Sequence, residues 1–319
     1  MKTYRLGLVG ARGYVGSELI ALIERHPRLA LGFVSSREWA GQYLSAHLPG
    51  YPRPLRCVGY GPEQAARSEV DVLVLAMPNT AAKPYVEAID SLAPQTLVLD
   101  LSADYRFDAN WYYGLPELTR SGYSGQRRIS NPGCYATAMQ LALSPIKDLL
   151  VGPAQCFGVS GYSGAGTSPS DKNNPNKLRD NLMPYSLCGH IHEGEVTRHL
   201  DHPVEFMPHV AAHFRGITMT VNARFAEPQD KAVLWQRYHR AYGSEPLIEL
   251  QDEPPWASQI AVRPGATIGG LSLSADGRRA VVVCCLDNLL KGAASQALQN
   301  INLALGMDEF LALATGAEQ

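Results

Sequence analysis

The chain has 319 residues, of which 45% are hydrophobic and 18% charged, and its formal net charge is −2 at pH 7. Such a composition suits one or two globular domains with sizeable cores. There is neither a basic excess nor an acidic tail, which argues against nucleic acid and anionic membrane surfaces as partners. No apolar run approaches the roughly 18 residues that a membrane-spanning helix needs.

The first residues, 1–5, lead directly into a predicted strand and leave no room for a signal peptide. The six cysteines show no CxxC pair and no other spacing typical of zinc sites. They are Cys57, Cys134, Cys156, Cys188, Cys284 and Cys285. We therefore expect a cytoplasmic protein with reduced cysteines and no metal site.

The chain opens with a strand–turn–helix pattern. An apolar run at residues 5–9 ends in a glycine-rich turn, and a helical apolar pattern then continues as far as His26. In a dinucleotide site, Gly10 would permit the tight turn, Gly13 the approach of the pyrophosphate, and Gly16 close packing of helix and strand. The spacing is GxxGxxG rather than GxGxxG, so a purely structural turn is the alternative. The predicted cofactor-binding residues of this turn are Gly10, Arg12, Gly13, Tyr14, Val15 and Gly16.

A second predicted strand, residues 29–34, ends in Ser35, Ser36 and Arg37. An NAD site usually has an acidic residue here for the ribose hydroxyls, whereas an arginine beside small hydroxyls suits a 2′-phosphate. The pattern therefore predicts NADP rather than NAD, with these three residues among its ligands. The alternative is an ordinary solvent-exposed loop arginine.

Two further apolar runs, residues 70–76 and 96–101, are almost uninterrupted. Such runs are typical of parallel strands that are covered on both faces by helices. In an open parallel sheet, ligands bind beyond the carboxyl ends of the strands. Arg106 follows the second run at such an end and is a candidate oxyanion clamp, although a surface ion pair would also explain it.

The stretch at residues 131–137 places Cys134 after a Pro-Gly turn and at the start of a helix predicted over residues 136–143. A thiol at a helix N-terminus faces unpaired backbone N–H groups and the positive end of the helix dipole, which favours the thiolate. A thiolate held in this way is a nucleophile that needs no metal. The alternative is a buried cysteine that packs as a small hydrophobic side chain.

A strand predicted at residues 155–159 runs into a loop rich in glycine and serine, residues 160–166. The backbone amides of such a loop can point at a phosphate or a nicotinamide amide, so Ser163 and Gly164 are candidate cofactor ligands. A flexible linker is the alternative. The polar stretch that follows, residues 167–181, is either a lid over an active site or an idle insertion.

Residues 189–195 are predicted to open a helix that carries two histidines. His192 and Glu195 are three positions apart and would share one helix face, with His190 close by. The spacing is not HExxH and no third ligand is evident, so an acid–base histidine oriented by a carboxylate fits better than zinc. An exposed polar cluster is the alternative.

The remaining pattern differs from the first half of the chain. Apolar residues alternate from Ile217 to Phe225, residues 231–242 read as a helix, and Asp276-Gly277 marks a hairpin between residues 271–274 and 280–286. These signals predict an antiparallel α+β layer.

A series of motifs in a fixed order carries a family resemblance. The motifs are Gly10–Gly16, Leu99–Arg106, Tyr113–Glu117, Asn131–Thr137, Ser160–Gly166, His190–Glu195, Pro208–Gly216 and Asp287–Gly292. On these residues the chain closely resembles the N-acetyl-gamma-glutamyl-phosphate reductases of arginine biosynthesis, which belong with the aspartate-semialdehyde dehydrogenase group. The matching stretches run almost from end to end.

The resemblance implies an α/β fold, in which an N-terminal Rossmann-like parallel-sheet domain is joined by an inserted α+β substrate and dimerisation domain. We expect the NADP-binding domain at residues 1–134, completed by a C-terminal helix at 290–319, and the inserted domain at 135–289. The resemblance also implies NADPH as cofactor and a homo-oligomer, either a dimer or a tetramer.

The resemblance further implies a covalent mechanism on an acyl phosphate, N-acetyl-glutamyl 5-phosphate, which NADPH reduces to the semialdehyde through a cysteine thioester. Cys134 would be the nucleophile and His192 the general base, with His190 as the second choice. The expected substrate-binding residues are Arg106, Asn131, Glu195 and Arg215. Asn288 and Lys291 would lie near the nicotinamide.

Three places depart from the family pattern. Thr167 stands where a basic residue is common, Ile191 separates the two histidines where arginine is common, and the stretch at residues 211–214 is also unusual. These departures bear on which acyl group the substrate carries more than on the type of reaction. One rival interpretation is a sister reductase acting on aminoadipyl or aspartyl phosphate. Another, of a different class, is a non-catalytic NADP-binding sensor.

Overall fold

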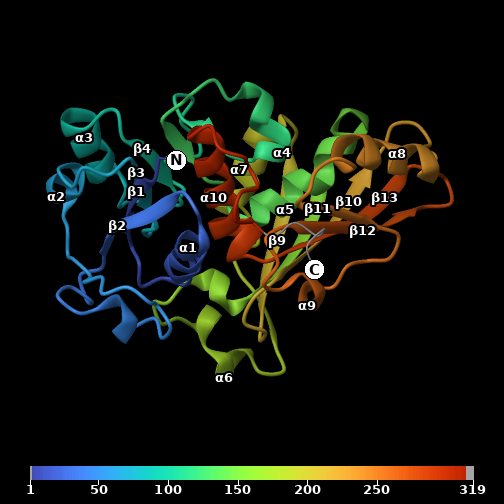
Figure 1. Ribbon diagram of the computed structural model, residues 1–319. Coiled ribbons are helices and arrows are strands. Elements are labelled where there is room, and N and C mark those ends of the chain that lie inside the picture. Colours follow the sequence, from blue (N-terminus) through green and yellow to red (C-terminus); the bar gives the residue numbers. More distant parts are fainter. Residues whose placement is uncertain (1, 314–319) are drawn as a thin grey trace. The chain divides into compact units, whose positions relative to one another are not determined.

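The computed structural model describes residues 2–313, and this part of the chain divides into two compact units (Figure 1). The first unit consists of residues 2–132 together with Ala293–Leu313, and the second of Gly133–Gly292. Within residues 2–313, every helix is too short or too polar to cross a membrane.

The first unit is built on a six-stranded sheet in which all neighbouring strands are parallel, in the order β2-β1-β3-β4-β6-β5. The strands are β1 (Tyr4–Val9), β2 (Leu29–Ser35), β3 (Val72–Leu75), β4 (Leu97–Asp100), β5 (Tyr112–Tyr113) and β6 (Arg128–Ser130). Every residue of β3 and β4 is buried, which explains the uninterrupted apolar runs at these positions. The expected parallel sheet is confirmed.

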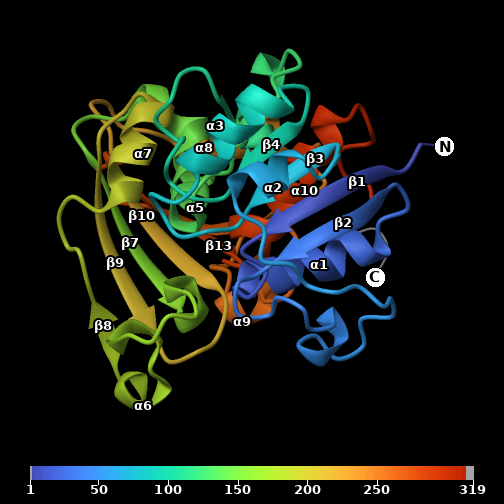
Figure 2. The ribbon, with the colours of Figure 1, turned by 90° about the vertical axis from the view of Figure 1, so that its left-hand side faces the viewer.

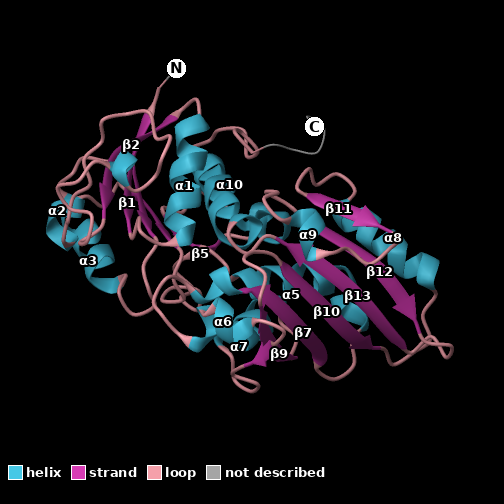
Figure 3. Cartoon of the chain, turned by 90° about the horizontal axis from the view of Figure 1, so that it is seen from below, coloured by secondary structure: helices cyan, strands magenta, loops and turns pink. Residues whose placement is uncertain are grey.

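Helices cover both faces of this sheet (Figures 1 and 3). One face carries α1 (Tyr14–Arg25) and α10 (Ser295–Ala304), which contact each other. The other face carries α2 (Pro62–Ala66) and α3 (Lys83–Leu92), whose apolar side chains share one core with Leu73, Leu75 and Val98. The short elements of the unit are η1 (Leu44–Ala46), α4 (Pro116–Thr119) and η2 (Arg120–Gly122).

The expected C-terminal helix at 290–319 is too long. A π-helical turn, η6 (Leu290–Ala294), precedes α10, which ends at Ala304; residues 314–319 lie outside the described part of the chain. Gly306 adopts a φ of +65° and ends the helix, since its N–H bonds to the carbonyl of Leu303 while the N–H of Met307 bonds to that of Asn302. Glycine adopts this left-handed conformation without steric cost.

The second unit contains a seven-stranded mixed sheet in the order β11-β12-β13-β10-β7-β9-β8 (Figure 3). The strands are β7 (Ala154–Gly161), β8 (Leu182–Pro184), β9 (Val204–Ala211), β10 (Ile217–Arg224), β11 (Ile248–Gln251), β12 (Ala266–Leu273) and β13 (Arg279–Leu286). The expectation of a purely antiparallel layer is wrong, because β7 pairs with β9 and β11 with β12 in parallel. The segment between β7 and β9 contains a helix and returns the chain to the same end of the sheet, as a parallel connection requires.

Helices α5 (Cys134–Leu143) and α8 (Lys231–Tyr242) lie on the same face of this sheet (Figure 3). The hydroxyls of Tyr238 and Tyr242 on α8 donate to the carbonyls of Ala142 and Leu141 on α5, at 2.6 and 2.8 Å. Helix α7 (Ile191–Leu200) packs beside α5 and β9 (Figure 2). The short elements of the unit are η3 (Ser144–Leu149), η4 (Tyr162–Ala165), η5 (Asp171–Asn173), α6 (Pro175–Leu178) and α9 (Ala257–Ile260).

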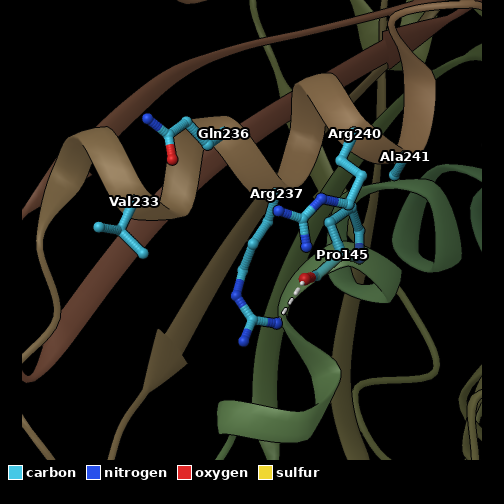
Figure 4. A pocket seen from close by; sticks show the side chains of 6 residues that line it. All are labelled: Pro145, Val233, Gln236, Arg237, Arg240 and Ala241. Carbon is cyan, nitrogen blue, oxygen red and sulfur yellow. Dashed lines mark hydrogen bonds between the residues drawn. The ribbon is translucent and has the colours of Figure 1, made fainter.

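A shallow groove runs between η3 and α8, lined by Pro145, Val233, Gln236, Arg237, Arg240 and Ala241 (Figure 4). Arg237 spans it by donating to the carbonyl of Pro145 and to the carboxylate of Asp148. The groove contains none of the residues that the sequence nominates for a site.

The glycine turn after β1 is required by packing as well as by conformation. Gly10 has a φ of +92°, and a Cβ there would lie 2.0 Å from the carbonyl oxygen of Ala76. Gly16 would meet the backbone of Ala11 at 2.7 Å, whereas at Gly13 the nearest atom is 3.7 Å away. Close packing therefore requires glycine at positions 10 and 16, whereas Gly13 is bordered by open space.

This difference gives a prediction for stability. Gly10→Ala should lower the free energy of unfolding by about 2 kcal/mol or more, because it combines a backbone clash with a left-handed φ. Gly13→Ala is the matched control: with a φ of −68° and open space around it, it should change stability by less than about 0.5 kcal/mol. Urea unfolding followed by circular dichroism measures both, and equal midpoints would contradict the packing argument.

Candidate active site

Cys134 is the first residue of α5, and its neighbour Gly133 caps the helix in an extended conformation. Cys134 is partly exposed, whereas the next nine residues of the helix are buried. No side chain caps this N-terminus and its first turn contains no acidic residue. The backbone N–H groups of the first turn and the helix dipole therefore favour a negative charge on the sulfur.

The other cysteines differ from Cys134 in their surroundings. Four of them are buried, and burial raises the pKa of each thiol, which keeps it protonated. They are Cys57, Cys156, Cys284 and Cys285. Cys188 is exposed but lies outside helices and strands. Cys134 is thus the cysteine whose environment suits a nucleophile.

The turn before Cys134 is held by a buried carboxylate. Glu195 is completely buried, and its Oε1 accepts a hydrogen bond from the N–H of Gly133 at 2.8 Å. A charged acceptor makes a strong bond to a backbone N–H. The sequence analysis assigned Glu195 to the substrate; the structure places it on the backbone of the cysteine turn, which indicates a positioning role.

Both predicted histidines lie at the start of α7. His190 caps this helix, and its Nδ1 accepts a hydrogen bond from the N–H of His192 at 3.2 Å. The two rings are 4.8 Å apart, and both lie edge-on to the ring of Tyr135, at 6.3 and 5.9 Å. Both histidine rings therefore lie against the side chain of Tyr135, the residue that follows Cys134 at the start of α5.

The surroundings of His190 favour its neutral form. Burial lowers its pKa most, and the positive charge of Lys172 lowers it further, while Glu193 and Glu195 act in the opposite direction. A histidine that is neutral at pH 7 can accept a proton.

Sequence reasoning missed two tyrosines of this cluster. The hydroxyl of Tyr135 donates to the carbonyl of His209 at 2.7 Å and is also hydrogen-bonded to the hydroxyl of Tyr185. Burial, followed by the negative charge of Cys134, raises the pKa of Tyr185 to about 12. Tyr135 directly follows Cys134 in the sequence, but no local signal singles out Tyr185.

A second cluster in the same unit joins the residues predicted to contact the nicotinamide. Asn288 donates from Nδ2 to the hydroxyl of Ser163 at 2.9 Å and accepts from the N–H of Gly216 at 2.7 Å. Ser163 and Gly164 belong to η4 rather than to an open loop. A Cβ at Gly164 would lie 2.9 Å from the hydroxyl of Ser160, so this turn also requires a small residue.

The neighbouring residues Asp287 and Lys291 are fully buried. Asp287 forms an ion pair with Arg215 at 2.5 Å and accepts hydrogen bonds from the N–H groups of Val262 and Leu289. Arg215, predicted to bind substrate, is therefore oriented at its Nε by a buried carboxylate. Lys291 lies in the π-helical turn η6.

In the first unit, the carboxyl ends of β1 and β3 form the point where the strand order reverses. In folds of this type the cofactor lies outside such a point. The backbone N–H groups of Gly10 and Ala11 bond to the carbonyl of Ser35, which places the glycine turn beside the end of β2. The N-terminus of α1 has no side-chain cap and no acidic residue, so it can bind a pyrophosphate.

The two arginines near the glycine turn and the end of β2 differ in their surroundings. Arg12 forms an ion pair with Glu38 at 2.8 Å, whereas Arg37, after Ser36, is exposed. These positions fit a bound NADP: an open glycine turn for the pyrophosphate and an accessible guanidinium near the end of β2 for a 2′-phosphate.

Arg106 and Asn131 are both buried in the first unit. Arg106 donates to the carbonyls of Asn131 and Leu101, each at 2.9 Å. The side chain of Asn131 accepts from Nδ2 of Asn300 at 3.3 Å, and its own Nδ2 donates to backbone carbonyls. We infer that Asn131 shapes the segment ending at Pro132, since its side chain is wholly buried.

Within residues 2–313, no three side chains of His, Cys, Asp or Glu come together as a metal ion would require. The residues nominated for chemistry instead form two groups, one in each unit. Cys134, the histidine pair, Glu195 and the Asn288 cluster belong to the second unit, and the glycine turn with Arg37 belongs to the first.

Comparison with known proteins agrees with these features. A family profile described as semialdehyde dehydrogenase, NAD binding domain, matches residues 5–125, and one described as semialdehyde dehydrogenase, dimerisation domain, matches residues 134–288. The chain resembles aspartate semialdehyde dehydrogenase II of Vibrio cholerae with a TM-score of 0.76 at 16% identity, covering 96% of this chain and 99% of that one. The enzyme of Candida albicans, solved with NADP, gives a TM-score of 0.71 at 16% identity, covering 95% and 99%. These likenesses show the fold.

Closer relatives show the family. The N-acetyl-gamma-glutamyl-phosphate reductase of Xanthomonas axonopodis pv. citri is 61% identical over 308 residues, which is 97% of this chain and 98% of that protein. The reductase of Xylella fastidiosa is 58% identical over 311 residues, covering 98% and 95%. The family resemblance expected from the motifs is confirmed: the chain belongs to the semialdehyde dehydrogenase family and, within it, to the N-acetyl-gamma-glutamyl-phosphate reductases.

Proposed function

We propose that this protein reduces N-acetyl-gamma-glutamyl phosphate to the semialdehyde and phosphate in arginine biosynthesis, with NADPH as cofactor. The observation that carries the proposal is the placement of Cys134. It is partly exposed at a helix N-terminus without a side-chain cap, behind a turn held by Glu195, and a histidine pair lies against the ring of its neighbour Tyr135. A sensor that only binds NADP has no need of this arrangement.

The reaction begins with attack of the Cys134 thiolate on the acyl carbon. A sulfur–carbon bond forms, the carbon–oxygen bond to phosphate breaks, and phosphate leaves, so that a thioester remains. The transient oxyanion needs hydrogen-bond donors, and the backbone N–H groups at the start of α5 supply them. Because these groups are fixed by the helix, no reorganisation is needed during the reaction.

When bound, NADPH would supply the hydride for the thioester carbon. The oxyanion left on this carbon would take up a proton from water to give a thiohemiacetal, still bonded to Sγ. Its hydroxyl proton must then leave as the carbon–sulfur bond breaks, which releases the semialdehyde and the Cys134 thiolate. In our proposal His192 accepts this proton. His190 fixes the backbone of His192, because its Nδ1 accepts a hydrogen bond from the His192 N–H.

Each unit carries residues that suit one part of the cofactor. Gly13 and the N-terminus of α1, with Tyr14 and Val15, would hold the pyrophosphate, and Ser36 and Arg37 the 2′-phosphate. Ser163, Gly164 and Asn288 would hold the nicotinamide amide. Arg215 would bind the carboxylate of the substrate, because Asp287 already fixes the direction of its guanidinium.

The protein would act as a homo-oligomer through the sheet of its dimerisation domain. In β10, Ile217, Met219 and Val221 are buried, while the alternate residues Thr218 and Thr220 are partly exposed on the other face. On this second face Phe157 is 37% exposed. We propose that a second copy covers this face.

Cys134→Ser tests the covalent mechanism. The change keeps the size of the side chain but removes the nucleophile and leaving group, so activity should fall by ~10³-fold or more. NADPH binding, followed by cofactor fluorescence, should be retained. Cys188→Ser is the matched control and should keep full activity, since Cys188 is exposed and lies outside helices and strands. Retained turnover in Cys134→Ser would sink the thioester scheme.

Arg37→Ala tests the choice of cofactor. Loss of the guanidinium should raise the KM for NADPH about tenfold and leave the KM for NADH nearly unchanged, because only NADPH carries the 2′-phosphate. Arg53→Ala, which removes an arginine paired with Glu24 in the same unit, should affect neither value. An equal change for both cofactors would remove the argument for NADP.

Glu195→Ala tests the positioning of the cysteine turn. It deprives the Gly133 N–H of its acceptor, so kcat should fall by about 10–100-fold with little change in the KM for NADPH. Glu195→Gln keeps an acceptor oxygen, so it should retain more activity than Glu195→Ala. Iodoacetamide should also alkylate Cys134 faster in Glu195→Gln than in Glu195→Ala. If the Ala and Gln variants behave alike, the carboxylate acts elsewhere than on this turn.

A further inference from the structure

The polar stretch at residues 167–181 is an ordered part of the second unit. Asn173 donates from Nδ2 to the carbonyls of Gly166 and Ser168, at 2.8 and 2.7 Å, and accepts at Oδ1 from the N–H of Ser170. These bonds fold the chain into η5 and fix the residue before Asn173, which is Lys172.

Lys172 extends toward the tyrosine–histidine cluster described above. Its Nζ lies 4.7 Å from the centre of the Tyr185 ring, and the same ring lies 5.6 Å from that of His190. The hydroxyl of Tyr185 bonds to that of Tyr135, the neighbour of Cys134. Lys172 is therefore linked to the cysteine end of α5 through the side chains of Tyr185 and Tyr135.

Within the described chain, the positive charge of Lys172 is not paired with a carboxylate. Among residues 2–313, no carboxylate lies within ion-pair distance of its ammonium group, whose contact is the ring of Tyr185. Lys177, in the same stretch, is instead paired with Asp171 at 2.7 Å. The acidic residues nearest the histidines are also engaged: Glu193 accepts from the N–H of Phe206, and Glu195 from that of Gly133.

A cation that rests on an aromatic face keeps its charge available. The ring attracts the ammonium group weakly and fixes its place, but does not neutralise it as a carboxylate would. The influence of this charge already reaches the site, since it contributes to the lowered pKa of His190. An arriving oxyanion would find an ammonium group held in position and without a competing anion.

We propose that Lys172 binds an anionic oxygen of the substrate beside Cys134, and so contributes to the recognition of an acyl phosphate that also carries a carboxylate. The inference rests on the proposed function. The shared chemistry is that of an oxyanion, which either the phosphoryl group or the carboxylate of the substrate can supply.

The test compares Lys172→Met with Lys177→Met in the full-length enzyme. Methionine keeps the length of the apolar stem and removes the charge. Lys172→Met should raise the KM for the acyl phosphate at least about tenfold, with kcat and the KM for NADPH within about threefold of the unaltered enzyme. Lys177→Met, whose charge is paired with Asp171, should leave all three values unchanged, and Lys172→Arg should restore most of the KM.

The reverse reaction separates the two sources of the oxyanion. A raised KM for inorganic phosphate with an unchanged KM for the semialdehyde assigns Lys172 to the phosphoryl group, and the opposite result assigns it to the carboxylate. Unchanged KM values in both directions, or a loss confined to kcat, would overturn the proposal while leaving the reductase function intact. An unaltered enzyme that turns over no acyl phosphate would overturn the proposed function, and the role of Lys172 with it.

Discussion

The hydrogen bond from the Gly133 N–H to the buried carboxylate of Glu195 joins two helices at the point where the reactive thiol emerges. Gly133 caps α5 and Glu195 lies in the second turn of α7, so this one bond relates the nucleophile to the helix that carries the histidines. A buried carboxylate without a donor would be costly, and so would a buried N–H without an acceptor. Each therefore keeps the other in place.

The periodicity of α7 extends this constraint to the proposed base. His192 precedes Glu195 by three positions, so it lies on the helix face that the bond turns toward α5. His190 caps the start of the helix by accepting the His192 N–H. A single helix start thus orients the cysteine turn and the histidine pair together, and both histidine rings lie edge-on to the Tyr135 ring.

Burial decides which polar groups can take part in chemistry. The thiols of four cysteines are enclosed and their pKa values raised, while Cys134 is left partly exposed at a helix N-terminus. In the same way, Glu193, Glu195 and Asp287 are committed to backbone N–H groups or to Arg215. Lys172 differs from these groups because its charge rests on a ring, which is why we assign it to the substrate.

The sequence by itself determined the local features: the strand–turn–helix at Gly10, the helix at residues 231–242, the hairpin at Asp276-Gly277 and the cysteine at a helix start. Hydrophobic period, glycine and turn chemistry act over a few residues, so they can be recognised in the chain alone. The motifs, in their order, also identified the family.

Only the tertiary structure decided what depends on contacts between distant residues. It pairs β7 with β9 in parallel, ends α10 at Ala304 and turns the carboxylate of Glu195 toward the cysteine turn. It also brings Tyr185 and Lys172 to the histidines, although neither has a distinctive sequence context. Such contacts arise from packing between segments far apart in the chain, and no short-range pattern records them.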